Sequence, residues 1–179
     1  MLYRKATMAD IPAMHTLIQE YAKEGIMLRR PIMMLYESVR DFIVAVDDDE
    51  TTNQIVGCGG LHILWSDLAE IRSLAVHPDY KGKGAGKGIV DYLVNEGKEL
   101  GLGRIFALTY QQVFFEKCGF HVVQKESLPQ KVWKECVYCD KFHQCDEIAV
   151  IKFLVPQTEL PADTFEIPLF ELPNWNNKG

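Results

Sequence analysis

The spacing of apolar residues near the start of the chain predicts a short strand followed by an amphipathic helix. Residues 2–6 read as the strand, and Thr7 to Asp10 supplies an N-cap hydroxyl with an acid three residues later, typical of a helix start. Gly25 stands where a C-terminal cap is expected. The apolar positions at helical spacing, which we assign to the core, are Ile11, Met14, Leu17, Ile18 and Tyr21.

Strand-like segments dominate the rest of the chain. After a short helix around residues 33–39, strands are predicted over 42–46, 55–64 and 68–76, with an acidic hairpin loop at 47–50. A glycine-rich loop then precedes a helix that runs to about residue 100. The remaining predicted elements are a strand over 104–109, a short helix over 111–117 and strands over 120–124 and 148–154. This order indicates a mixed α/β (α+β) domain.

The last part of the chain has a different composition. Beyond Val155, four prolines and scattered acids indicate an extended tail. We therefore predict one domain over residues 1–154 and a proline-containing tail over 155–179. A hydrophobic content of 47% is normal for a single globular domain of this length.

Charge and composition exclude several classes of function. A net charge of −6 argues against a general nucleic-acid binder. Every apolar run is far shorter than the roughly 18 residues that a membrane span needs, and the first residues lack the pattern of a signal peptide. Five cysteines, an odd number, fit a reducing compartment. We expect a cytoplasmic protein with neither nucleic acid nor membrane as partner; the oligomeric state stays open, with a homodimer as one option.

The most informative segment is the glycine-rich loop over residues 76–88. Glycines allow close approach of a ligand, and the N–H groups at the start of the following helix favour an anion such as phosphate. The dinucleotide pattern fails because Lys87 and Ile89 occupy the positions of its last glycine, and the P-loop fails because no Ser or Thr follows either Gly-Lys pair. The alternative is an ordinary turn between a strand and a helix.

Two motifs carry a family resemblance. Lys81-Gly82-Lys83-Gly84-Ala85-Gly86, after a strand ending in Leu74 to Pro78, resembles the pyrophosphate-binding signature of the GNAT acetyltransferase superfamily, although Lys81 replaces its usual Gln or Arg. Phe114 to Phe120 resembles the helix and turn that close the CoA site, so the resemblance covers about residues 2–154. It implies a mainly antiparallel central sheet flanked by helices, with acetyl-CoA as co-substrate. The implied CoA-binding residues are Leu74, Ala75, Val76, Lys81, Gly82, Lys83, Gly84, Ala85, Gly86, Lys87 and Phe115.

The same resemblance implies direct attack of an amine on the thioester. Glu70 matches the position of a general base in many members; the alternative is a strand-surface acid paired with Arg72. Backbone N–H groups of residues 74–76 would stabilise the oxyanion. Phe115 fills the place of the usual thiolate-protonating Tyr, and we expect Tyr110 to be too distant. Water, another residue or unassisted departure of the thiolate remain open.

A closer resemblance concerns the acceptor. Residues 25–30, 56–62 and 65–72 look like the corresponding segments of short bacterial N-acetylglutamate synthases, which implies L-glutamate as acceptor at the start of arginine biosynthesis. Guanidinium groups bind carboxylates in bidentate fashion, so Arg29, Arg30 and Arg72 are candidate ligands of the acceptor. The alternatives are a GNAT enzyme acting on another small amine or a protein terminus, and a non-catalytic acyl-CoA-binding regulatory module.

Cysteines late in the chain form a possible metal site. Cys136 and Cys139, followed by His143 and Cys145, resemble a small zinc site, but reduced cysteines beside strands are an equally simple reading. Cys58 and Cys118 are assigned to the core, and His62 and His77 to structural roles.

Overall fold

The sheet is the organising element of the molecule. The computed structural model describes residues 1–48, 53–128 and 145–161, and within them seven strands form one sheet in the order β1-β2-β3-β4-β5-β7-β6. Neighbouring strands pair antiparallel except β4 and β5, which are parallel. The strands are β1 (Leu2–Lys5), β2 (Phe42–Val46), β3 (Ile55–Ile63), β4 (Leu68–Val76), β5 (Arg104–Thr109), β6 (His121–Val123) and β7 (Ile148–Phe153). The expected mixed, mainly antiparallel sheet is confirmed.

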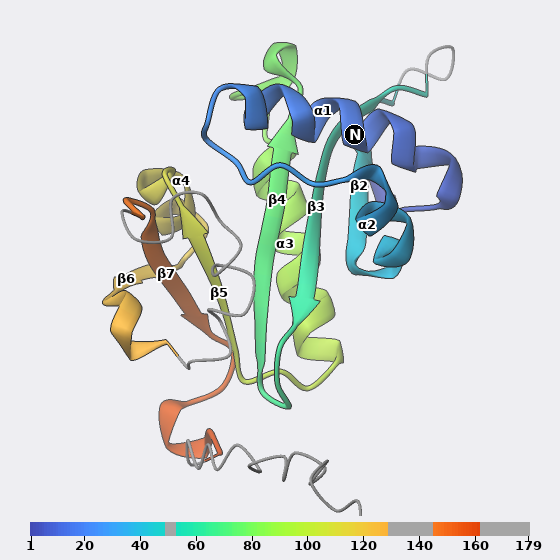
Figure 1. Ribbon diagram of the computed structural model, residues 1–179. Coiled ribbons are helices and arrows are strands. Elements are labelled where there is room, and N and C mark those ends of the chain that lie inside the picture. Colours follow the sequence, from blue (N-terminus) through green and yellow to red (C-terminus); the bar gives the residue numbers. More distant parts are fainter. Residues whose placement is uncertain (49–52, 129–144, 162–179) are drawn as a thin grey trace, which may run out of the picture.

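Helices cover both faces of the sheet. They are α1 (Ile11–Lys23), α2 (Ile32–Glu37), α3 (Ala85–Glu99) and α4 (Gln112–Lys117). Figure 1 shows α1 and α2 on one face and α3 on the other. In β2, Ile43 and Ala45 pack in the cluster that contains α3, whereas Phe42, Val44 and Val46 pack with α1. All five β2 residues are buried because both faces are covered, which explains the unbroken apolar run.

A β-bulge in β4 changes which side chains face each helix layer. Gly60 pairs with Arg72 and Cys58 with Ala75, so two residues of β4, Ser73 and Leu74, lie opposite Gly59. Ser73 has a positive φ of 52°, unusual for a residue with a side chain. Before the bulge Ala69 and Ile71 pack toward α3; after it Leu74 and Val76 do. The extra residue therefore inverts the alternation and leaves Glu70 and Arg72 on the α1 face.

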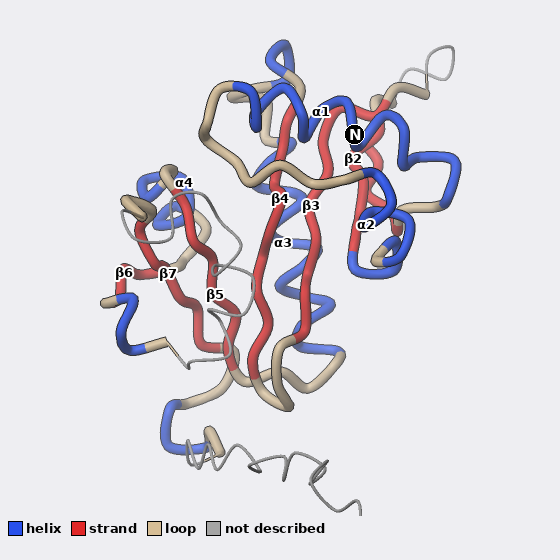
Figure 2. The backbone as a smooth tube through the Cα atoms, viewed as in Figure 1, coloured by secondary structure: helices blue, strands red, loops and turns tan. Residues whose placement is uncertain are grey.

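The sheet opens between β4 and β5 after Glu70, shortly before the bulge. Residues 68–70 of β4 pair with residues 104–106 of β5, whereas β5 pairs with β7 along its whole length, residues 104–109. Figure 2 shows β5 and β7 separating from β4 toward the end of the sheet at which α4 lies. Parallel pairing of only three residues thus holds two halves of one sheet together at one end and lets them diverge at the other.

The first helical turn is anchored by a buried carboxylate. Asp10 accepts hydrogen bonds from Arg4 Nη1 and Nη2 at 2.7 and 2.9 Å, from the Thr7 N–H at 2.7 Å and from Thr7 Oγ1 at 2.8 Å. The guanidinium of Arg4, helped by the two Thr7 donors, holds the pKa of Asp10 at about 2, below the ordinary value of 3.8. These bonds confirm the expected capping arrangement.

Replacing Asp10 by Asn is expected to lower the free energy of unfolding by about 1–2 kcal/mol at pH 7, allowing for solvent screening at Arg4. The folded pKa lies below the unfolded one, so the contribution of Asp10 is complete above pH 4 and is lost as the pH falls toward 2. Denaturant unfolding at pH 7 and pH 3 measures the difference, with the exposed Asp79→Asn as control. An equal difference at both pH values would contradict the assignment.

The parts of the chain expected to be irregular are described only in part. Pro156 is followed by a short 3-10 turn at Gln157–Glu159, and residues 162–179 of the expected tail lie outside the described residues. None of the helices in the described ranges is long and apolar enough to cross a lipid bilayer.

Candidate active site

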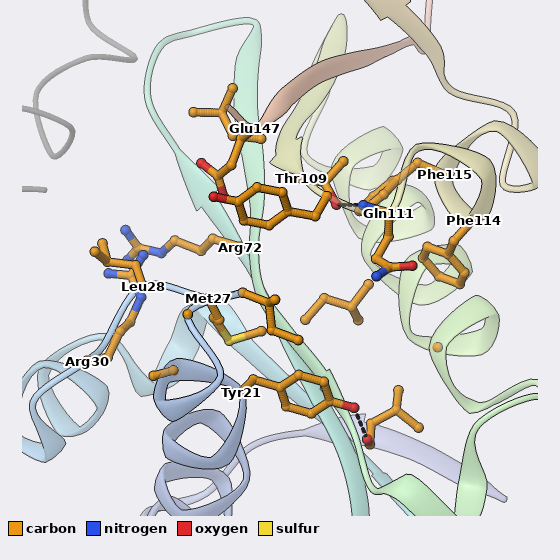
Figure 3. A pocket seen from close by; sticks show the side chains of 18 of the residues that line it. Tyr21, Met27, Leu28, Arg30, Arg72, Thr109, Gln111, Phe114, Phe115 and Glu147 are labelled. Carbon is orange, nitrogen blue, oxygen red and sulfur yellow. Dashed lines mark hydrogen bonds between the residues drawn. The ribbon is translucent and has the colours of Figure 1, made fainter. Parts of the chain in front are cut away.

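A large cleft occupies the opening between β4 and β5. Its volume is about 950 Å³, and its walls come from the C-terminal end of α1, residues 25–30, β4, the glycine loop, the end of β5, α4 and the residues before β7. Figure 3 shows side chains from these elements around one open space. We call it the central cleft. Both predicted CoA-binding residues and predicted acceptor-binding residues line it.

The structure places most of the predicted site residues in the wall of the central cleft. Those that line it are Arg29, Arg30, Glu70, Arg72, Leu74, Val76, Lys81, Gly82, Gly86 and Phe115. Ala75 is buried on the α1 face instead, Ala85 is buried at the start of α3, and Lys87 pairs with Asp91 on the surface. Lys83 stacks over Tyr80, with Nζ 5.0 Å from the ring centroid. CoA contacts through the backbone of residues 83–85 stay a prediction.

The glycine loop brings a helix N-terminus to the cleft. Gly82 and Gly84 have positive φ angles of 76° and 89°, and Gly84 is the N-cap of the 15-residue α3. Glycine adopts this conformation without the strain that a side chain brings. A Cβ at Gly86 would come within 3.3 Å of the Phe114 ring, so glycine also keeps this wall open. Backbone N–H groups and the positive end of α3 suit this loop to a diphosphate.

Tyr21 closes the wall between α1 and the glycine loop. Its hydroxyl donates a hydrogen bond of 2.5 Å to the carbonyl of Val76, and Lys81 Nζ lies 4.9 Å from its ring centroid. Tyr21 packs against the core cluster of α1, as its helical spacing predicts, and it also lines the cleft, which the spacing alone could not show. A cation over an aromatic face is stabilising, so Tyr21 holds Lys81 at the cleft.

Two buried guanidinium groups lie in the wall of the central cleft. Arg30 is 6% exposed and its Nε donates to Ser73 Oγ at 2.8 Å; Arg72 is 8% exposed and its Nη2 lies 3.5 Å from Asp41 Oδ2. Asp41 also contacts His62 Nδ1 at 3.0 Å. Arg29, by contrast, is exposed. Of the three arginines predicted to bind the acceptor, Arg30 and Arg72 are therefore the two whose guanidinium groups are buried in the cleft wall.

Glu70 stands on the same strand as Arg72. It is half-buried and lines the central cleft, on the face that the bulge leaves toward α1. Asp41, which comes from another part of the chain, is one carboxylate partner of Arg72. A carboxylate in the cleft wall can accept a proton from an amine that binds in the cleft.

Two aromatic residues near the end of β5, Tyr110 and Phe115, line the central cleft, and only Tyr110 carries a hydroxyl group. Phe115 is 3% exposed and packs edge-to-face against Phe114 and Phe120, with ring centroids 5.2 Å apart in each pair. Tyr110, expected to be too distant, lines the central cleft, and its hydroxyl donates to Asp146 Oδ1 at 2.6 Å. A phenol is thus present in the cleft although Phe115 has none.

The cysteine and histidine predictions divide into two groups. Cys58 and Cys118 are buried in the core as expected, and burial raises the pKa of the Cys58 thiol to about 12. His62 contacts Asp41, and His77 Nδ1 accepts from the Asp79 N–H at 3.3 Å, as structural residues do.

Three residues of the predicted zinc site, Cys136, Cys139 and His143, lie outside the described residues. Within residues 1–48, 53–128 and 145–161 no three potential metal ligands cluster, so zinc receives no support.

Comparison with known proteins identifies the family. The model of the acetyltransferase (GNAT) family matches residues 11–120. An uncharacterized N-acetyltransferase of Chlorobaculum tepidum is 39% identical over 84% of this chain and 95% of its own length. An amino-acid acetyltransferase of Mycobacterium tuberculosis is also 39% identical, over 84% of this chain and 82% of its own.

A solved structure agrees with both relatives. A protein from Mycobacterium tuberculosis in complex with CoA and NLQ superposes with a TM-score of 0.74 at 34% identity, covering 87% of this chain and all of that one. Its fold agrees with the sheet and helices described above, and that structure contains CoA. The chain belongs to the GNAT acetyltransferase family and is an acetyl-CoA-dependent N-acetyltransferase.

Proposed function

We propose that the protein acetylates the α-amino group of L-glutamate, at the start of arginine biosynthesis in the cytoplasm. The observation that carries the proposal is the pair of buried guanidinium groups, Arg30 and Arg72, in one cleft with Glu70. An acceptor with two carboxylates and one amine is complementary to this set of charges. The amino-acid acetyltransferase from Mycobacterium tuberculosis supports an amino-acid acceptor.

Arg30 and Arg72 are held by different parts of the chain. The Gln19 amide donates to the carbonyl of Arg30 at 3.0 Å, and Arg30 Nε bonds to Ser73, so its position is fixed from α1 and from the bulge. Arg72 is oriented by Asp41. The two groups are therefore fixed before the acceptor binds, which reduces the entropy lost on binding.

The proposed reaction needs one base and one oxyanion site. Glu70 accepts a proton from the α-ammonium group, and the free amine attacks the thioester carbonyl carbon. Backbone N–H groups of β4 beyond the bulge stabilise the tetrahedral oxyanion. The C–S bond then breaks, the attacking nitrogen loses its second proton to water as the amide forms, and the CoA thiolate takes one proton from water or from Tyr110.

An acceptor panel tests the proposal. The full chain is incubated with acetyl-CoA and each free amino acid, a set of simple amines or a peptide with a free N-terminus, and release of CoA thiol is recorded. L-Glutamate is expected to give a rate well above the background hydrolysis of acetyl-CoA. A peptide or non-amino-acid amine as the best acceptor would overturn the assignment, and CoA binding without thiol release from any amine would favour the non-catalytic reading.

Replacing Arg72 by Gln is expected to raise the KM for L-glutamate about 10- to 100-fold, because a hydrogen bond to a charged group contributes about 1.5–3 kcal/mol. The KM for acetyl-CoA is expected to stay within about twofold. Steady-state kinetics measure both, and a thermal melt checks that the variant is folded. Arg40→Gln, an exposed arginine outside the cleft, is the matched control. A rise in both KM values would place Arg72 in a general structural role.

A further inference from the structure

One oxygen atom of Asp41 contacts side chains from two different strands. Asp41 Oδ2 lies 3.0 Å from His62 Nδ1 on β3 and 3.5 Å from Arg72 Nη2 on β4. Asp41 is the last residue of the short 3-10 turn Val39–Asp41, which leads into β2. The carboxylate therefore joins His62, which has no part in the reaction proposed above, to an arginine that lines the central cleft.

The register of β3 and β4 places these groups on one face of the sheet. Leu61 packs in the core cluster that contains α3, so the next residue, His62, points to the opposite face. Across the two strands His62 is paired with Glu70, and Gly60 is paired with Arg72. Because Gly60 has no side chain, the carboxylate from the turn before β2 can reach the arginine opposite it.

The charged groups around the imidazole of His62 come from two elements. β4 contributes the carboxylate of Glu70 and the guanidinium of Arg72. The turn before β2 contributes Asp41 and also carries Arg40, which is exposed. The residues that α1, α2 and β2 bury against the sheet are all apolar. The side chain of His62 is 31% exposed and that of Arg72 only 7%, so the imidazole can exchange a proton with solvent while the guanidinium stays within the cleft wall.

Resting on the proposed function, we infer that His62 is a positioning residue of the acceptor site, which through Asp41 sets how strongly Arg72 attracts a carboxylate of the acceptor. When the imidazole is neutral, the negative charge of Asp41 offsets part of the positive charge of Arg72. When the imidazole takes up a proton, its own charge offsets Asp41, and the attraction of Arg72 for an acceptor carboxylate increases. A guanidinium has several N–H donors, so its bond to Asp41 is compatible with a bidentate bond to the acceptor.

The test is the KM for L-glutamate, measured at saturating acetyl-CoA between about pH 6 and pH 8, the range in which an imidazole ordinarily changes its charge. In the wild type this KM is expected to rise about three- to tenfold from the lower to the higher pH, because the protonated imidazole favours carboxylate binding. In His62→Asn it is expected to change less than about twofold, because the amide keeps a hydrogen-bond donor near the position of Nδ1 but takes up no proton.

A second variant and a control accompany this measurement. Asp41→Asn keeps an oxygen that accepts hydrogen bonds but has no charge, so it should lose the pH dependence of the KM as well. His121→Asn replaces an exposed histidine of β6 outside the cleft and should keep the wild-type profile.

The possible failures are distinguishable. A wild-type KM for L-glutamate that is the same at both pH values would overturn the role of His62 alone, and so would a wild-type profile in a folded His62→Asn. If the wild type releases no thiol with L-glutamate at either pH, the proposed function fails, and the inference fails with it.

Discussion

Glu70→Gln is expected to lower kcat by about 10²- to 10⁴-fold, the usual contribution of a positioned general base. The substitution keeps the shape of the side chain that lines the central cleft but removes its ability to accept a proton. The KM for acetyl-CoA should change little, because Glu70 lies on the α1 face of β4 and the glycine loop is formed by other residues. Steady-state kinetics with saturating acetyl-CoA measure the loss.

The pH dependence makes this test sharper. An amine that no base deprotonates reacts only through its free fraction, which rises tenfold per pH unit below its own pKa. The activity of Glu70→Gln should therefore climb with pH and approach the wild type at alkaline pH. Glu99→Gln, at the exposed end of α3, serves as a charge-matched control. A variant with wild-type kcat at neutral pH would show that Glu70 is not the base.

Much of the fold could be predicted because the elements follow either a hydrophobic period, as α1 and α3 do, or an unbroken apolar run, as β2 does. The ends of β4 and β5 agree with the sequence prediction at Leu68–Val76 and Arg104–Thr109. The bulge could not be predicted in this way. Ser73 has no local signal for its positive φ, and the inversion of the two faces of β4 depends on pairing with β3.

The candidate site was predictable where residues are close in sequence and not where contacts are distant. The glycine loop can be recognised from its local sequence. The sequence of the Arg29-Arg30 pair, in contrast, does not show which arginine is buried, because the contact of Arg30 with Ser73 joins distant parts of the chain. Tyr110 and Glu147 meet the cleft only because β5 and β7 pair with each other and separate from β4. Contacts of this kind follow from sheet topology and not from local pattern.

The second large effect concerns the diphosphate site. Gly82 lines the cleft with a positive φ of 76°, and a Cβ added there would have no atom within 4 Å. Asn and Asp tolerate such a backbone better than other residues with side chains. Gly82→Asp and Gly82→Asn therefore share the same modest strain and the same shape, and differ by one negative charge.

Gly82→Asp is expected to raise the Kd for CoA about 100-fold, and Gly82→Asn less than about tenfold. A carboxylate close to a diphosphate costs about 2–3 kcal/mol at an effective dielectric constant typical of a protein surface. Isothermal titration calorimetry with CoA measures both values. The gap between the variants should narrow in 1 M salt, where the Debye length falls from about 10 Å to about 3 Å. Equal affinities for the two variants at low salt would show that the diphosphate binds away from residues 81–86. That result would contradict the assignment of the glycine loop as the CoA-binding site.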